Sequence, residues 1–308
     1  MIRELKALLT PPTLPSRPHD HASNPPLRPF GVDLALPAVG GTARKTNHDY
    51  TGGQLAELID AIVDEEATLF VSAVGVPPPW VIEKLHASGV VVMNMVGHPR
   101  HAEKAFEAGA DLVCAQGGEG GGHTGEIPMH ILVPACVDVA RRYRPRMLRG
   151  GEGMVVAAGG VWDGRGLAAA LAMGAVGVWV GTRFVASEEA GCSDAHKAAV
   201  LEAGWEDTVR TLVVSGRPLR VRRNEYVDGW ERREKEMKDD CARGVVPMEK
   251  DWEEGREVDL PFLMGQVSAV VKDVKPAGEI VETMVREAVE HLGRAGDYVD
   301  NGRGRSKL

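Results

Sequence analysis

The chain has 308 residues, 44% of them hydrophobic, which is enough apolar material for one large domain and a smaller one. Its formal net charge is −8 and it has no long basic block or membrane-length apolar run, which argues against nucleic-acid binding and membrane spanning. The four cysteines show no C-x-x-C spacing, so we expect a reduced intracellular protein without structural disulfides.

The first 30 residues stand apart from the rest of the chain. Residues 1–9 resemble a short piece of helix, and residues 10–29 contain seven prolines among polar residues. This composition predicts a disordered or extended segment rather than a folded element. We therefore expect the folded domain to begin near residue 31.

From residue 31 onward, apolar segments of strand length alternate with helical patterns. The predicted strands are residues 31–36, 68–74, 90–96, 112–115, 154–158 and 177–180. The predicted helices between them are residues 54–64, 79–88, 101–108, 129–143 and 166–173. Short apolar strands alternating with helices indicate βαβ units around a parallel sheet.

The polar and glycine-rich stretches all follow a strand and precede a helix. This arrangement favours a TIM-barrel-type (β/α)8 fold, because a doubly wound sheet concentrates its site at one switch point. Only six strands can be counted in residues 31–203, so the predicted barrel is incomplete by about two units. We interpret residues 204–295 as a mostly helical second domain and residues 296–308 as a flexible tail. The predicted helices of the second domain are residues 226–243, 266–274 and 279–292, and a further helix is predicted just before it, at 194–203.

The most distinctive motif is L-V-C-A-Q-G-G-E-G-G-G-H-T-G-E, at residues 112–126. It begins as a buried strand, continues through Gln116 into six glycines among residues 117–125, and presents His123. Glycine lets backbone approach a ligand closely, and an imidazole with a pKa near ~6.5 suits a general base. Taken alone, the motif fits either a flat ligand against the backbone with a base beside it, or a flexible surface loop.

Two further strands end in glycine and lead into helices, in V-V-A-A-G-G-V-W-D-G-R-G (155–166) and G-V-W-V-G-T-R-F (177–184). Backbone N–H groups and the helix dipole at such junctions attract anions. A consecutive pair is typical of the phosphate site after the last two strands of a TIM barrel. The alternative is that these glycines only form tight turns.

These motifs together resemble the nitronate monooxygenase family, formerly called 2-nitropropane dioxygenases. G-V-D-L-A-L-P (31–37) and P-F-L-M-G-Q-V (261–267) are similar to its fungal members, and the resemblance covers about residues 30–295. It implies a TIM-barrel flavoprotein that binds FMN, has no metal, and oxidises alkyl nitronates with O₂ to a carbonyl compound and nitrite.

The resemblance also implies roles for individual residues. His123 corresponds to the catalytic base of the family. Asp33 falls where many members carry an asparagine that touches the flavin. The residues that correspond to FMN-binding positions are Gln116, Gly121, Gly160, Trp179, Val180, Gly181 and Thr182.

The chain departs from the family at its start, where a first strand with its Met/Gly-rich loop and a second βα unit are absent. The sequence interpretation favours a truncated gene product over a degenerate paralogue, because the remaining motifs keep their chemistry. Two other functions stay open: another FMN oxidoreductase, such as an NAD(P)H:quinone or enoyl-thioester reductase, and a non-catalytic remnant.

Three smaller features complete the analysis. His98 and His101 follow a strand at helical spacing, which favours a histidine at a helix start over a metal ligand. Asn94 and Met95 lie at a strand end and are expected to line the substrate cavity. The chain ends in Ser306-Lys307-Leu308, a peroxisomal address, so we expect recognition by the peroxisomal import receptor and a peroxisomal location.

Overall fold

The computed structural model describes residues 29–300. The predicted N-terminal helix (1–9), most of the Pro-rich segment and the Ser306-Lys307-Leu308 signal therefore lie outside the described residues. None of the helices within 29–300 has the length and hydropathy needed to cross a bilayer.

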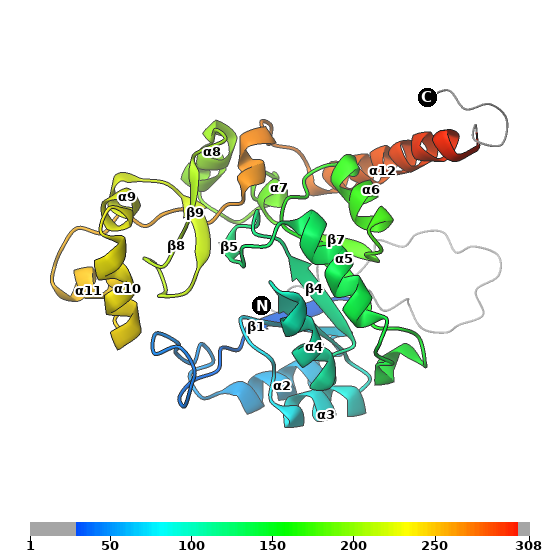
Figure 1. Ribbon diagram of the computed structural model, residues 1–308, viewed down its shortest axis with the longest axis horizontal. Helices are drawn as coiled ribbons and strands as arrows, with labels where there is room; N and C mark the ends of the chain where they lie inside the picture. The colour runs from blue at the N-terminus through cyan, green and yellow to red at the C-terminus, as the bar shows by residue number, and fades with distance from the viewer. Residues whose placement is uncertain (1–28, 301–308) are drawn as a thin grey trace.

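A six-stranded parallel sheet forms the centre of the molecule, in the order β1-β2-β3-β4-β6-β7 (Figure 1). Its strands are β1 (Gly31–Ala35), β2 (Leu69–Ala73), β3 (Val91–Val96), β4 (Leu112–Gln116), β6 (Met154–Ala158) and β7 (Gly177–Trp179). The strands pair in chain order, as expected of successive βαβ units with right-handed crossovers. The predicted partial barrel of six strands is confirmed.

Helices cover the outer face of this sheet and bury the main hydrophobic core against it. They are α2 (Leu55–Asp64), α3 (Pro79–Ala87), α4 (Pro99–Glu107), α5 (Met129–Ala140) and α6 (Gly164–Ala172), and a short 3₁₀ turn, η1 (Arg146–Leu148), follows α5. A smaller apolar cluster fills the inner face around Val71, Met93 and Cys114. Successive side chains of a strand point to opposite faces of the sheet, so alternate residues of each strand pack into two different cores.

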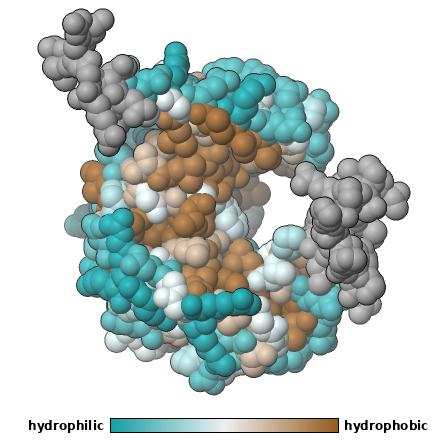
Figure 2. Space-filling view, turned by 90° about the vertical axis from the view of Figure 1, so that its right-hand side faces the viewer, coloured by the Kyte–Doolittle hydropathy of each residue, from teal (hydrophilic) through white to brown (hydrophobic). Residues whose placement is uncertain are grey.

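Within residues 29–300 the sheet does not close into a barrel: β1 pairs only with β2 and β7 only with β6. The long helix α12 (Ala277–Asp300) packs on α6 beside this opening. Figure 2 faces that side and shows hydrophobic residues gathered into one area framed by hydrophilic ones. Exposed apolar side chains on α6, β7, the turn before β7, and α12 include Leu171, Val176, Trp179, Val281, Val285 and Val289.

The C-terminal region combines its helices with a small antiparallel sheet that the sequence analysis did not predict. It contains two strands, β8 (Thr208–Thr211) and β9 (Leu219–Arg222), which pair with each other. Strand β9 also pairs with the short β5 (Gly122–His123), so the three form one antiparallel sheet. The remaining elements are α7 (Thr182–Val185), α8 (Asp194–Glu202), α9 (Glu225–Glu231), α10 (Glu234–Arg243), α11 (Pro247–Glu253) and the 3₁₀ helix η2 (Gln266–Val270).

Three predicted helix boundaries are also corrected. The helix predicted at 226–243 is two helices, α9 and α10. The helix predicted at 266–274 is only η2, because its β-branched residues disfavour helix and Pro276 biases the preceding residue towards extended backbone. Helix α12 continues to Asp300, into the segment predicted as tail, since each added residue gains a hydrogen bond once a helix is formed.

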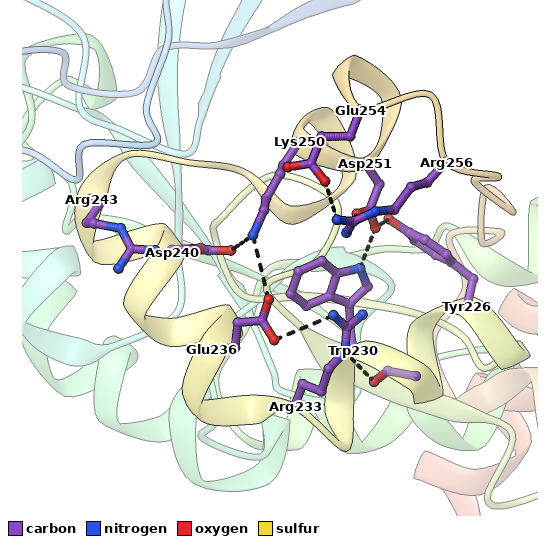
Figure 3. Close-up of polar contacts among 11 residues, drawn as sticks. Tyr226, Trp230, Arg233, Glu236, Asp240, Arg243, Lys250, Asp251, Glu254 and Arg256 are labelled. Atoms are coloured by element: carbon purple, nitrogen blue, oxygen red, sulfur yellow. Dashed lines mark hydrogen bonds and ion pairs between the residues drawn. The ribbon is translucent and has the colours of Figure 1, made fainter.

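A polar cluster between α9, α10 and α11 holds this part of the chain together (Figure 3). Asp251, which is buried, accepts hydrogen bonds from the Trp230 indole and the Tyr226 hydroxyl, each at 2.8 Å, and pairs with Arg256 at 2.7 Å. The Arg233 guanidinium stacks on the Trp230 ring, 3.9 Å from its centroid. Because this cluster anchors the helices that follow β8 and β9, it supports the small sheet that carries His123.

Candidate active site

A cavity of about 1020 Å³ opens at the carboxyl ends of the six parallel strands. The loops after every strand contribute to its wall, and residues of the C-terminal region close it from the other side. This is the face at which TIM-barrel enzymes place their catalytic groups, and the volume is at the upper end of ligand pockets.

His123 lies in this cavity, held by a strand rather than by a free loop. It belongs to β5, where it pairs with Leu219 of β9, and its Nε2 is 2.9 Å from the Ser215 hydroxyl. Burial, and then the positive charge of Arg217, lower the pKa of His123 below its ordinary value. The imidazole is therefore neutral at physiological pH, the form that accepts a proton. This position argues against the flexible-loop alternative.

Gln116, at the end of β4, braces the loop that carries His123. Its amide donates to the carbonyl oxygens of Gly121 at 3.3 Å and of His123 at 3.0 Å. Both donors of the amide are thus engaged with the loop. Gln116 also lines the cavity, and a direct contact between its amide and a flavin stays a prediction.

Gly121 is required by the close approach of another segment of the chain. A Cβ atom built there would lie 2.6 Å from the backbone of Met264 and 2.8 Å from that of Gly265. Gln266 N donates to the Glu119 carbonyl at 2.9 Å, which fixes the same contact. The segment P-F-L-M-G-Q-V therefore packs on the glycine loop, and both face the cavity.

The predicted phosphate site lies at the loops after β6 and β7, although one predicted donor is unavailable there. The N-terminus of α6 is already capped, because Asp163 accepts from Gly166 N and Glu287 of α12 accepts from Gly164 N, both at 3.0 Å. An anion at this place must therefore use the backbone that precedes α6 and the loop after β7.

That backbone forms an open cradle. Gly159 and Gly160 both have positive φ, at 77° and 78°. No hydrogen bond within the described part of the chain uses the backbone N–H of Gly160, Gly181 or Thr182, and all three residues line the cavity. A Cβ atom at Gly181 would meet nothing within 4 Å. Free N–H groups in such a concave turn are the donors that phosphate needs.

The side chains of the predicted FMN-binding residues 179–182 lie in different surroundings. Trp179 lines the cavity, but Val180 packs on the main hydrophobic core and is outside the cavity lining. The Thr182 hydroxyl accepts from Gly265 N at 2.9 Å, so it ties α7 to the segment over the glycine loop.

The strand ends β1 and β3 supply further wall residues. Asp33 lines the cavity, and partial desolvation by the barrel wall raises the pKa of its carboxyl. Asn94 is buried; its amide donates to Met95 O at 3.0 Å, while its Oδ1 has no hydrogen-bond partner in residues 29–300. A buried acceptor without a partner costs about 1–3 kcal/mol, so this atom is suited to a ligand donor.

His98 is a helix-start residue, as predicted: it is the N-cap of α4, and its Nδ1 accepts from Arg100 N at 3.1 Å. His101 lies one turn on, with the two rings 5.6 Å apart. Among the described residues no group of three metal-binding side chains comes together.

Sequence reasoning missed several residues of this site, among them Ser215, Arg217 and Val74. Ser215 and Arg217 come from the loop before β9, which nothing in the sequence marks as part of the cavity. Arg217 donates to Asn47 Oδ1 at 2.7 Å and to Val74 O at 3.0 Å. Val74, directly after β2, has a φ of 70°, which is rare for a β-branched residue. The S-G-R-P sequence at 215–218, with Gly216 at positive φ, signalled only a turn.

The sheet order, the cavity at the strand ends and the glycine cradle define a TIM-barrel-type α/β protein with an incomplete barrel. Residues 32–287 match the family described as nitronate monooxygenase. The chain belongs to this family of oxidoreductases.

Individual relatives agree with this assignment. The chain is 35% identical over 221 residues to a nitronate monooxygenase of Neurospora crassa, covering 69% of this chain and 57% of that protein. It is 31% identical over 314 residues to a Mycobacterium tuberculosis (3aS,4S,5R,7aS)-5-hydroxy-7a-methyl-1-oxo-octahydro-1H-indene-4-carboxyl-CoA dehydrogenase, covering 89% and 82%. The chain spans 63% of the length of another M. tuberculosis relative, with 34% identity.

Solved structures show the same fold. FabK from Thermotoga maritima superposes with a TM-score of 0.70 at 29% identity, covering 88% of this chain and 79% of that one. A nitroalkane oxidase from Streptomyces ansochromogenes gives a TM-score of 0.68 at 25% identity, covering 87% and 82%.

Proposed function

We propose that this protein binds FMN and oxidises alkyl nitronates with O₂ to a carbonyl compound and nitrite. The family assignment and the similarity to a nitroalkane oxidase support this reaction. When bound, FMN supplies the transfer of electrons from the substrate to O₂. The remaining tasks, which are binding, orientation and proton transfer, fall to the residues of the cavity.

Two parts of the cavity suit FMN: the glycine cradle after β6 and β7, and the wall at Asn94. The free N–H groups of Gly160, Gly181 and Thr182 suit the phosphate, and no cationic side chain is needed there. The unpartnered Oδ1 of Asn94 suits a donor on a polar ring system. Gly160 has a φ of 78°, a left-handed conformation that glycine adopts without strain, and this conformation shapes the cradle.

The observation that carries the proposal is the placement of His123. Its neutral imidazole lies in the same cavity as the glycine cradle, and Ser215 and β9 fix its orientation. A nitronate anion reacts without losing a proton, whereas a neutral nitroalkane must first lose its α-proton. We assign that proton to His123, and the electron pair of the broken C–H bond moves into the nitro group to form the nitronate.

The test has two steps. The purified chain is mixed with FMN and desalted, and retained flavin absorbance supports the cofactor assignment. The loaded protein and its His123→Asn variant are then assayed for nitrite with a nitronate and with the parent nitroalkane. We expect His123→Asn to keep FMN and the nitronate rate but to lose the nitroalkane rate. Equal nitroalkane rates in the two proteins would refute the base assignment.

A second candidate is another FMN oxidoreductase on the same scaffold, such as an NAD(P)H:quinone or enoyl-thioester reductase. The likeness to FabK and to a mycobacterial dehydrogenase named for a CoA thioester supports it. Rapid anaerobic bleaching of the bound flavin by NADH or NADPH would favour this candidate. Bleaching by a nitronate alone would favour the first.

We also propose a peroxisomal location, from the Ser306-Lys307-Leu308 terminus. A fluorescent protein fused to the N-terminus leaves this signal free. Punctate fluorescence that becomes diffuse when the tripeptide is deleted would support the proposal, and an unchanged distribution would refute it.

A further inference from the structure

One wall of the cavity is basic, in a protein whose net charge is −8. We call Arg44, Arg100 and Lys104 the basic wall. All three line the cavity: Arg44 comes from the loop after β1, Arg100 lies in the first turn of α4, after β3, and Lys104 lies in its last turn. A fourth cation, Arg217, faces them from the loop before β9.

These cations lack acidic partners in the described part of the chain. No ion pair within residues 29–300 involves Arg44, Arg100, Lys104 or Arg217, although many exposed arginines and lysines elsewhere are paired. Of the acidic side chains that line the cavity, Glu126 is paired with Arg210 at 2.6 Å. Asp33 and Glu119 also line the cavity, and within residues 29–300 neither forms an ion pair with the basic wall.

Neighbouring groups respond to this charge. The pKa of His101 is lowered by partial burial and then by Arg100, His98 and Lys104. The pKa of Arg217 is lowered by burial and then by Arg44. Cations that line one cavity without ion-pair partners create a positive potential there, which attracts an anionic ligand.

The basic wall is separate from the predicted FMN phosphate cradle. The sheet order is β1-β2-β3-β4-β6-β7: the cradle follows β6 and β7 at one end, and the basic wall follows β1 and β3 at the other. His123, from the loop after β4, lies between them. The two ends use different chemistry, backbone N–H groups at one and mobile cationic side chains at the other.

A small nitronate carries one negative charge, and Arg217, which acts electrostatically on His123, is sufficient to balance it. Three further cations exceed that need. We propose that the basic wall binds a diphosphate group carried by the substrate or co-substrate, whose reacting carbon lies at His123. Such a group occurs both in coenzyme A thioesters and in nicotinamide dinucleotides. This inference rests on the proposed function for the position of the reacting carbon.

The probe is inorganic pyrophosphate, titrated calorimetrically into the FMN-loaded protein so that the glycine cradle is filled. We expect binding, and we expect the double variant Arg100→Gln/Lys104→Gln to weaken it at least about tenfold, because it removes two cations that would hydrogen-bond the anion. Added salt should weaken binding to the native protein more than to the variant.

A matched control removes the same charge elsewhere. Lys45 is next to Arg44 but is outside the cavity lining. Arg149 precedes β6, so it lies at the amino ends of the strands, away from the cavity. Lys45→Gln/Arg149→Gln should bind pyrophosphate as the native protein does. Equal weakening by both double variants would mean that only net charge matters and would overturn the site.

Competition then separates the sources of the diphosphate. Displacement of pyrophosphate by coenzyme A supports a thioester substrate, and displacement by NADH supports a dinucleotide. If pyrophosphate does not bind, or if neither competitor displaces it, the inference is wrong. Pyrophosphate binding that depends on the basic wall in a protein that retains no FMN would instead refute the proposed function and keep the basic wall.

Discussion

The Ser215 hydroxyl lies 2.9 Å from Nε2 of His123, although 92 residues separate the two in the chain. The pairing of β5 with β9 brings them together, because Leu219 opposite His123 places the preceding loop against the imidazole. The candidate base is thus oriented by the C-terminal region, while the strand that leads to it belongs to the barrel.

Replacing Ser215 with alanine tests this relationship. We expect Ser215→Ala to lower kcat/KM for a neutral nitroalkane about tenfold, since it loses one hydrogen bond that orients the ring, and to leave the nitronate rate nearly unchanged. Nitrite release with both substrates is the measurement. Ser88→Ala, on the distant end of α3, is the control. A parallel loss with both substrates would indicate a general structural role instead.

Arg217→Gln should change the pH dependence of the same reaction. The cation disfavours the imidazolium, so its removal raises the pKa of His123 towards its ordinary value. Because the base acts in its neutral form, the acid limb of kcat/KM for the nitroalkane should move to higher pH. Lys45→Gln, which removes an equal charge outside the cavity, should leave the profile in place. A limb that stays or moves to lower pH would contradict the electrostatic role of Arg217.

Gly160→Ala should weaken FMN binding. The residue has a φ of 78°, and the added methyl group would point towards Glu119 within the cradle. Gly40→Ala is a matched control, because Gly40 has a φ of 79°, is outside the cavity lining, and has nothing within 4 Å of its Cβ position. Both should lose about 1–2 kcal/mol of stability, as left-handed alanines do. Only Gly160→Ala should raise the Kd for FMN, measured by flavin fluorescence.

Asp251→Asn should destabilise the protein by about 1–3 kcal/mol, because it removes the charged acceptor to which the Trp230 indole and the Tyr226 hydroxyl donate. Burial alone would raise the pKa of Asp251, but hydrogen bonds from Trp230, Tyr226 and Arg256 outweigh it and hold the pKa below its ordinary value. The folded state therefore binds this proton less readily than the unfolded state, so the stability that Asp251 contributes is lost as the pH falls through its lowered pKa.

Urea unfolding followed by tryptophan fluorescence measures this effect. Asp239→Asn, at an exposed position of α10, is the control and should leave the midpoint unchanged. If Asp251→Asn unfolds at the same urea concentration as the native protein, the polar cluster of Figure 3 does not anchor the C-terminal region.

The barrel was predictable because its signals are local. The apolar runs and the helix starts, such as His98 before Pro99, depend on neighbouring residues, and the strands pair in chain order. The cradle at Gly160 and Gly181 was predictable for the same reason, since it follows directly from two strand ends.

The small antiparallel sheet was not predictable, because it joins residues far apart in the chain. Strand β5 has only two residues and resembles part of a glycine loop, and eight other elements separate it from its partner β9 in the chain. The capping of α6 by Glu287 is equally non-local, over 123 residues. Pairings of this kind are decided by tertiary packing, which local propensity does not report.

The left-handed backbone of Val74 has a consequence for the balance between stability and activity. A β-branched residue at this φ costs about 1–3 kcal/mol, and the rest of the fold must compensate for it. Its carbonyl, turned by that conformation, accepts the hydrogen bond from Arg217 at 3.0 Å. Val74→Gly would release the strain, so we expect it to raise the melting temperature while it loosens Arg217 and slows turnover. The more stable variant, Val74→Gly, would then be less active than the native protein.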